Sequence, residues 1–133
     1  MAATGAPERP FTGMTPLHEA ARDGQLSVAR RLLAGGEDID ERNHLDRTPL
    51  HLAAAQGHAE MAALLLEHGS RLDTIDLFGM TPLHLAVFMD RKEMVQLLLG
   101  YGAGMDARGN TRVTPLGMAA MRGNVPLAQL LRQ

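Results

Sequence analysis

Histidines are the residues of this chain whose type and spacing could support metal binding or acid–base catalysis. Three of the six, His18, His51 and His84, recur at intervals of 33 residues. If each occupies the same place in a repeated unit, the three rings lie about one unit apart. They then cannot share a zinc ion, whose ligands stand roughly 2 Å from the metal. The regular spacing therefore favours a structural role for these side chains.

Other patterns typical of enzymes fail on inspection. His18-Glu19-Ala20-Ala21-Arg22 begins like the H-E-x-x-H helix of zinc proteases, but Arg22 stands where the second histidine is required. Residues 102–107 match a G-x-G-x-x-A dinucleotide loop, yet they follow a predicted helix and not a strand. The chain has no cysteine, and its only serines are Ser27 and Ser70. We therefore predict no catalytic residues, no metal site and no cofactor.

Four carboxylates crowd into the segment Glu37-Asp38-Ile39-Asp40-Glu41. A calcium loop needs the D-x-D-x-D-G arrangement of ligands, which this segment lacks. The segment also falls between predicted helices. We interpret it as a solvated run of charge in a connecting loop.

The composition indicates a single intracellular domain. The chain has 133 residues and a net charge of −2, so no excess of positive charge points to nucleic acid or to an anionic membrane. Residues 1–10 lack the apolar stretch of a secretory signal, and the apolar runs are too short to span a bilayer. We expect a soluble cytoplasmic protein, also nuclear if its source is eukaryotic, that binds neither membrane nor nucleic acid.

The elements that carry these residues begin at a recurring Thr-Pro-Leu segment. It occupies residues 15–17, 48–50, 81–83 and 114–116, always 33 residues apart; histidine follows in three copies and Gly117 in the fourth. A threonine hydroxyl can accept a hydrogen bond from a free amide of a helix's first turn. Proline suits the first helical position, where no N–H is needed. Each copy therefore predicts the start of a helix.

Glycines predict where the helices end. Gly24, Gly57 and Gly123 share one repeat position, where a left-handed residue would end the first helix. Asp90 holds that position in the third copy and is one of the better non-glycine residues for it. A second helix follows in the first three copies and is predicted to stop at Gly36, Gly69 or Gly102.

The Thr-Pro-Leu-His-x-Ala pattern with a period of 33 residues resembles the ankyrin repeat, over roughly residues 10 to 131. The resemblance implies an all-α fold, an ankyrin-type α-solenoid of stacked helix-turn-helix repeats with β-hairpin-like fingers, in one domain over residues 1–133. The expected repeats cover about 10–42, 43–75, 76–108 and 109–133, the last shortened as a C-terminal cap, with residues 1–9 flexible.

The family also implies roles for particular residues. The histidine of each Thr-Pro-Leu-His segment is expected to form hydrogen bonds within and between repeats, and His58, in a Gly-His pair, is expected to be structural. His44 and His68 are expected on the surface. Besides Asp90 and Gly117, the departures from the family pattern are Asp46 and Arg112, which stand where a finger turn usually has glycine.

A comparison of the four copies indicates where a partner would bind. Ankyrin proteins recognise other proteins on a concave strip of finger tips and inner helix faces, and these positions vary here while the framework recurs. Repeat three is apolar at the variable positions and has arginines around it, as in a protein-binding patch. The predicted partner-binding residues are Ile75, Leu77, Phe78, Met80, Phe88, Met89, Met121, Arg42, Leu45, Arg47, Arg108, Arg112 and Arg122.

We therefore expect a non-catalytic module, monomeric alone, that binds a helix or extended segment of another protein with acidic flanks. Three alternatives stay open. Some of these side chains could pack between fingers as core, or the chain could be a designed or fragment ankyrin scaffold. It could also be a regulatory substrate of an Asp/Asn hydroxylase, because the family's modified asparagine corresponds here to Asp40, Asp73 and Asp106.

Overall fold

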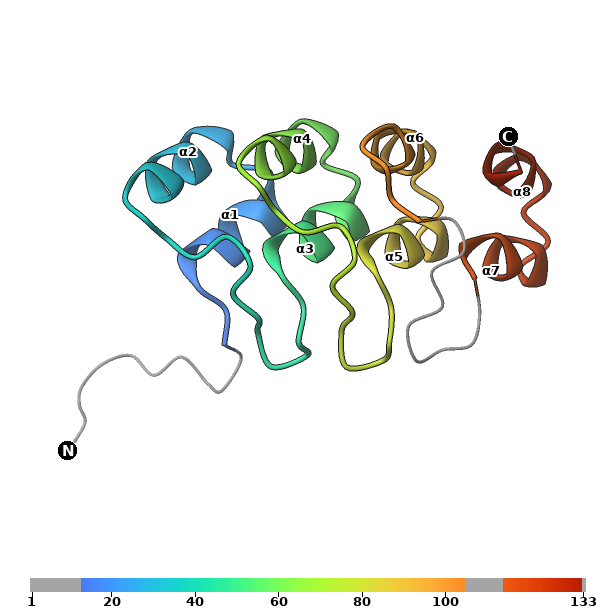
Figure 1. The fold of residues 1–133 in the computed structure, drawn as a ribbon, viewed down its shortest axis with the longest axis horizontal. Helices are drawn as coiled ribbons and strands as arrows, with labels where there is room; N and C mark the ends of the chain where they lie inside the picture. Colours follow the sequence, from blue (N-terminus) through green and yellow to red (C-terminus); the bar gives the residue numbers. More distant parts are fainter. Residues whose placement is uncertain (1–12, 105–113, 133) are drawn as a thin grey trace.

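The computed structural model describes residues 13–104 and 114–132, and within them the chain forms eight helices and no strand. The helices stack as four antiparallel pairs in two layers (Figure 1). The inner helices are α1 (Pro16–Asp23), α3 (Pro49–Gln56), α5 (Pro82–Phe88) and α7 (Pro115–Met121). The outer helices are α2 (Leu26–Ala34), α4 (Ala59–Glu67), α6 (Lys92–Gly100) and α8 (Val125–Leu131). Each inner helix contacts the next, so the predicted α-solenoid is confirmed.

The inner helices begin where the Thr-Pro segments predicted. The hydroxyl oxygens of Thr15, Thr48 and Thr81 each accept a hydrogen bond from the backbone N–H of the histidine three residues later. Thr114 caps α7 in the same way, through the backbone N–H of Gly117. A proline occupies the first turn of each of these helices and leaves no N–H without a partner there.

The inner helices also end as predicted. Gly24, Gly57 and Gly123 have φ values of 72°, 78° and 69°, in the left-handed region. Asp90 takes the same conformation with φ of 57°, although a residue with a Cβ atom pays about 1–2 kcal/mol for it. The repeat geometry therefore imposes the backbone conformation at this position on the aspartate.

The apolar core runs along the seam between the two layers. Inner helices contribute Leu17, Leu50 and Leu83, each at most 1 % exposed, at one repeat position. Outer helices contribute the buried side chains Met61, Leu65, Met94, Leu98 and Leu127. Buried alanines let neighbouring inner helices approach closely; they are Ala20, Ala21, Ala53, Ala54 and Ala86. The core therefore extends along the stack, and Ile39 and Leu72 of the connections between repeats pack against it.

The loops between repeats form the predicted fingers as tight turns without regular strand pairing. In the second finger, Asn43 N–H donates to the carbonyl of Arg47 and Asp46 N–H donates to that of Asn43. Asp46 has φ of 60°, close to the values of 64° at Gly13 and 79° at Gly79 in the neighbouring fingers. The aspartate thus keeps the glycine geometry. The corresponding Arg112 lies outside the described residues.

Candidate protein-binding surface

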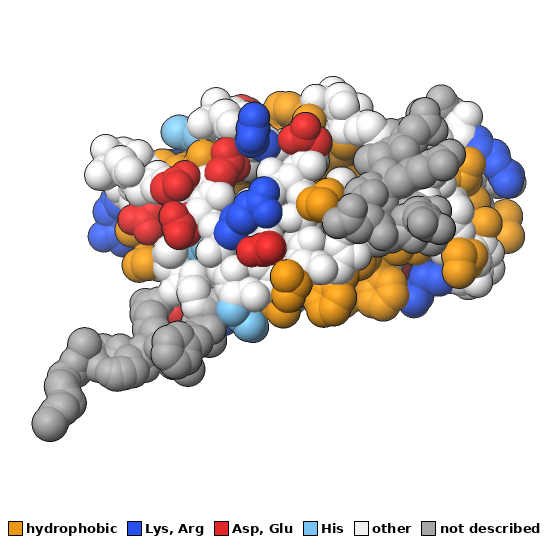
Figure 2. Space-filling view, turned by 60° about the horizontal axis from the view of Figure 1, so that its bottom comes forward, with side chains coloured by type: hydrophobic (Ala, Val, Ile, Leu, Met, Phe, Trp, Pro, Cys, Tyr) orange, Lys and Arg blue, Asp and Glu red, His pale blue; other side chains and the backbone are white. Residues whose placement is uncertain are grey.

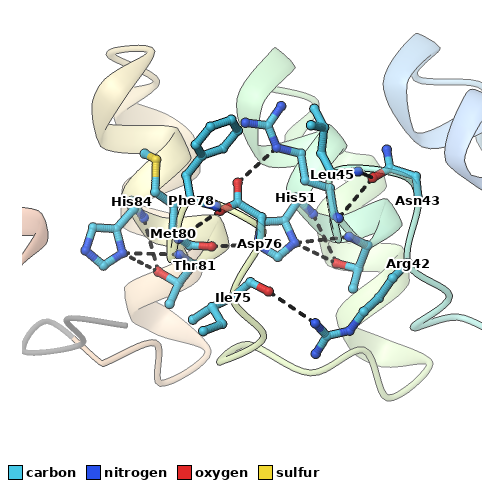
Figure 3. Close-up of polar contacts among 12 residues, drawn as sticks. Arg42, Asn43, Leu45, His51, Ile75, Asp76, Phe78, Met80, Thr81 and His84 are labelled. Carbon is cyan, nitrogen blue, oxygen red and sulfur yellow. Dashed lines mark hydrogen bonds and ion pairs between the residues drawn. The ribbon is translucent and has the colours of Figure 1, made fainter. Parts of the chain in front are cut away.

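Each described finger turn after the first is organised around one buried polar side chain. Oδ1 of Asn43 accepts hydrogen bonds from the backbone N–H groups of Leu45 and Arg47, at 2.9 and 3.0 Å. Oδ1 of Asp76 accepts from those of Phe78 and Met80, both at 2.9 Å (Figure 3). These two side chains fix the finger backbone, and with it the direction of the tip residues.

Sequence reasoning missed this role. The available signal was that an asparagine and an aspartate stand at one repeat position, five residues before Thr48 and Thr81. Short side chains of this kind bond to the backbone two residues on and so stabilise turns.

The second and third fingers are tied to each other by polar contacts. Arg47 Nε donates to Asp76 Oδ2 at 3.0 Å, and the Asp76 side chain is fully buried. The Arg47 guanidinium also lies over the Phe78 ring, 5.9 Å from its centroid. Leu77 N–H donates to the Leu45 carbonyl at 2.8 Å. The charge of Arg47 therefore neutralises a buried carboxylate, and its position in the fingers is fixed.

His18 and His51 each join their inner helix to the following finger. In His18, Nδ1 accepts a hydrogen bond from the backbone N–H of Thr15 at 3.2 Å, while Nε2 lies 2.9 Å from the Arg47 carbonyl. His51 repeats this arrangement with Thr48 N–H and the Met80 carbonyl. A carbonyl only accepts and a backbone N–H only donates, so each ring must be neutral, with its proton on Nε2.

Burial keeps these two rings neutral. It lowers the pKa of His18, and it lowers the pKa of His51 to about 4. His51 and His84 are fully buried beside their capping threonines. His58 donates from Nε2 to the Arg22 carbonyl of the preceding repeat at 2.9 Å. These contacts confirm the structural role predicted for the repeated histidines and for His58, while His44 and His68 are exposed as expected.

The remaining candidates for chemistry are dispersed. Across residues 13–104 and 114–132, no three histidine or acidic side chains are arranged to hold a metal ion. Asp40 Oδ1 accepts from the backbone N–H of Arg71 at 3.2 Å, which links two neighbouring connections. Asp73 is exposed, and Asp106 lies outside the described residues.

Five of the predicted partner-binding side chains are large, apolar and exposed. They are Leu77 at 61 %, Phe78 at 59 %, Phe88 at 45 %, Met89 at 41 % and Met121 at 78 % of their full accessible area, and we call them the apolar face. Their exposure excludes them from the core. The other described candidates are Ile75, Met80, Leu45 and Arg47, which are half-buried, and Arg42 and Arg122, which are exposed. Arg108 and Arg112 lie outside the described residues.

Comparison with known families agrees with the repeat geometry. A family model described as ankyrin repeats, in three copies, matches residues 17–111. The chain belongs to the ankyrin repeat family. A search of curated proteins found no match. Ankyrin repeats are generally protein–protein interaction modules and are typically non-catalytic. Beyond the matched residues, α7 and α8 form a fourth ankyrin-type pair.

Apolar surface gathers on the last two ankyrin repeats. At the C-terminal end of the inner helix, repeat one has the ion pair Arg22–Asp23, and repeat two has Ala55 and Gln56. The same positions hold Phe88 and Met89 in repeat three, and Met121 and Arg122 in repeat four. Figure 2 shows hydrophobic side chains along the finger edge of the molecule, while acidic side chains lie mainly over the N-terminal half. On this face, the two halves of the stack therefore differ in surface chemistry.

No helix in the described part of the chain combines the length and the apolar character that a membrane span requires.

Proposed function

We propose that this ankyrin repeat chain is a non-catalytic module that binds another protein through the apolar face of repeats three and four. The main support is that five large apolar side chains are exposed at positions where the repeat framework needs none. They are Leu77, Phe78, Phe88, Met89 and Met121. Large apolar side chains that are scattered singly on a surface need no explanation, but a group on one face of a monomer marks an interaction site.

The size and chemistry of the face support protein recognition. An aromatic side chain buries roughly 150–250 Å² on association, and aromatic residues carry much of the energy of interface hot spots. Methionines adapt their shape to a partner because their side chains are unbranched and flexible. Exposed Arg42 and Arg122 form a polar rim. The partner presents a helix or an extended segment with acidic flanks. The module itself is cytoplasmic, and it is monomeric without that partner.

The deciding experiment separates a recognition surface from packing. We expect Phe78→Ser and Phe88→Ser to change the free energy of unfolding in urea by no more than about 0.5 kcal/mol, as is usual at exposed sites. Leu50→Ala, at a fully buried position, is the control and should cost about 2–5 kcal/mol. Capture of partners from the native source should fall for both serine variants. Losses of several kcal/mol at both phenylalanines would instead mean that the face is packing surface.

A further inference from the structure

The three described arginines among the predicted binding residues differ in what they contact. Arg47 pairs with the buried carboxylate of Asp76, so its charge is already neutralised. Arg42 donates from Nη1 to the backbone carbonyl of Ile75 at 3.3 Å. Arg122 lies over the Phe88 ring, with its guanidinium carbon 4.7 Å from the ring centroid, and forms no ion pair with any described residue. Among the described residues, Arg122 is thus a positive charge held against the apolar face without an anion.

The contact with the Phe88 ring holds the Arg122 guanidinium through its charge and leaves its hydrogen-bond donors unused by the described residues. A cation over the face of an aromatic ring is attracted by the electron distribution of the ring and needs no hydrogen bond for that attraction. The N–H donors of a guanidinium lie in its plane and point outward, in the fork geometry that fits a carboxylate with two parallel hydrogen bonds. Nothing in the described chain accepts a hydrogen bond from this side chain. The group is therefore arranged to bind a carboxylate that arrives from outside.

We infer that Arg122 binds an aspartate or glutamate of the partner, and that this acidic residue lies next to an apolar residue of the partner that contacts Phe88 and Met89. This inference rests on the proposed function, because it assigns the charge preference of that face to one residue. Arg47 is excluded from the role, since withdrawing it would leave the buried Asp76 carboxylate unpaired.

A carboxylate fits this position better than a phosphate group. The site has one stacked arginine, and the carboxylate of Asp90, two residues after Phe88, accepts a hydrogen bond from Asn124 Nδ2 at 2.8 Å at the same end of α5. A doubly charged phosphate would meet more repulsion from Asp90 than a singly charged carboxylate, whose charge balances the single arginine.

A random twelve-residue peptide library displayed on phage tests the inference without knowledge of the natural partner. Selection on the full chain should enrich peptides with Asp or Glu adjacent to an aromatic or aliphatic residue. For a synthetic copy of an enriched peptide, Arg122→Gln should weaken binding about tenfold or more, as expected for a charge-assisted hydrogen-bond pair. Arg122→Lys should restore only part of the loss, because an ammonium group does not offer the planar fork. Arg30→Gln, which removes an exposed arginine of α2 in repeat one, should change nothing.

A double-mutant cycle gives the sharper result. Replacing the acidic residue of the peptide by its amide should weaken binding to the wild-type chain but cause no further loss with Arg122→Gln. Enriched peptides that lose binding with Phe88→Ser but not with Arg122→Gln would overturn the inference and leave the proposed function standing. Absence of any peptide sensitive to Phe88→Ser or Phe78→Ser would count against the proposed function itself.

Discussion

At the scale of single residues, the chain places ionisable side chains where only one protonation state fits. His18 and His51 each accept a hydrogen bond from the capping threonine with Nδ1 and donate one to the next repeat with Nε2. A second ring proton would therefore break the contact with the threonine. The residue type best suited to acid–base chemistry is therefore held in its neutral form and links two neighbouring repeats.

This arrangement predicts a loss of stability in mild acid. The folded-state pKa of His51 is lowered by burial to about 4, below its ordinary value of 6.5, so the unfolded chain binds the proton more readily. The stabilisation is complete above about pH 6.5 and is lost as the pH falls towards 4, by up to roughly 3 kcal/mol for this residue. Urea unfolding between pH 4 and 7 measures the effect.

Two substitutions identify the histidine responsible. His51→Gln should reduce this pH dependence and leave the part that comes from His18, whose pKa burial also lowers. His44→Gln, at an exposed site, should preserve it. Equal pH dependence in all three proteins would contradict the assignment.

At the scale of elements, replacement by alanine should have opposite effects on the free energy of unfolding at Gly57 and at Gly100, although both glycines lie at helix ends. Gly57 has φ of 78°, and an added Cβ would meet the Arg91 side chain at 3.0 Å; Gly57→Ala should destabilise the chain by about 1–2 kcal/mol. Gly100 ends α6 in helical conformation with open space around it, so Gly100→Ala should stabilise the chain by roughly 0.5 kcal/mol. Thermal and urea unfolding compare the two variants, and equal signs would refute this explanation of the helix ends.

Asp90 shows how a contact can modify an expectation from backbone geometry alone. Relief of the left-handed conformation favours Asp90→Gly by up to about 1 kcal/mol. The substitution also removes the acceptor of the Asn124 side chain, which bonds to Asp90 Oδ1 at 2.8 Å. We therefore expect a net change in unfolding free energy within about 0.5 kcal/mol, and a stabilisation of a full 1 kcal/mol would show that the contact contributes nothing.

The stability of the second and third fingers should depend on the pairing of Arg47 with Asp76. Arg47→Gln leaves the buried carboxylate without its partner and should cost more than about 1 kcal/mol of unfolding free energy. In an Asp76→Asn background, which imitates the neutral Asn43 of the preceding finger, the same change should cost much less. If the losses of unfolding free energy in the two single variants add up to the loss in the double variant, the Arg47–Asp76 contact does not contribute to stability.

At the scale of the whole molecule, the repeat period made the fold predictable from the sequence. It did not predict which arginines form contacts within the chain and which are available to a partner. Four in-phase Thr-Pro segments specify where the helices begin, because capping is local in sequence. The pairing of Arg47 with Asp76 spans 29 residues and depends on the burial of the acid. The stacking of Arg122 on Phe88 depends on how closely α7 approaches α5. Among the arginines predicted from the sequence, contacts alone distinguish a structural charge from an available one.

The stack should also be less stable towards its C-terminal end. Helix α3 packs between α1 and α5, whereas α7 contacts only α5 among the described inner helices, and its Leu116 and Met118 are only partly buried. Because neighbouring repeats stabilise each other, amide hydrogen exchange should be slower in α3 than in α7. Exchange followed by mass spectrometry measures this, and uniform protection along the chain would indicate that the stack opens as one unit.

The offset of 29 residues in the contacts between repeats has a consequence for how such a gene can change length. The two histidine contacts join adjacent copies and have a backbone carbonyl as acceptor, so an unequal crossover that duplicates a 33-residue stretch containing the histidine restores them in the longer product. The Arg47–Asp76 pair is restored only where an arginine again stands 29 residues before the acid. The breakpoint need not coincide with the end of a helix or a finger. A duplication of residues 76–108 would supply a second Leu77-Phe78 finger tip beside the first. Recombination could thus lengthen the apolar face by one copy without changing the spacing between adjacent repeats.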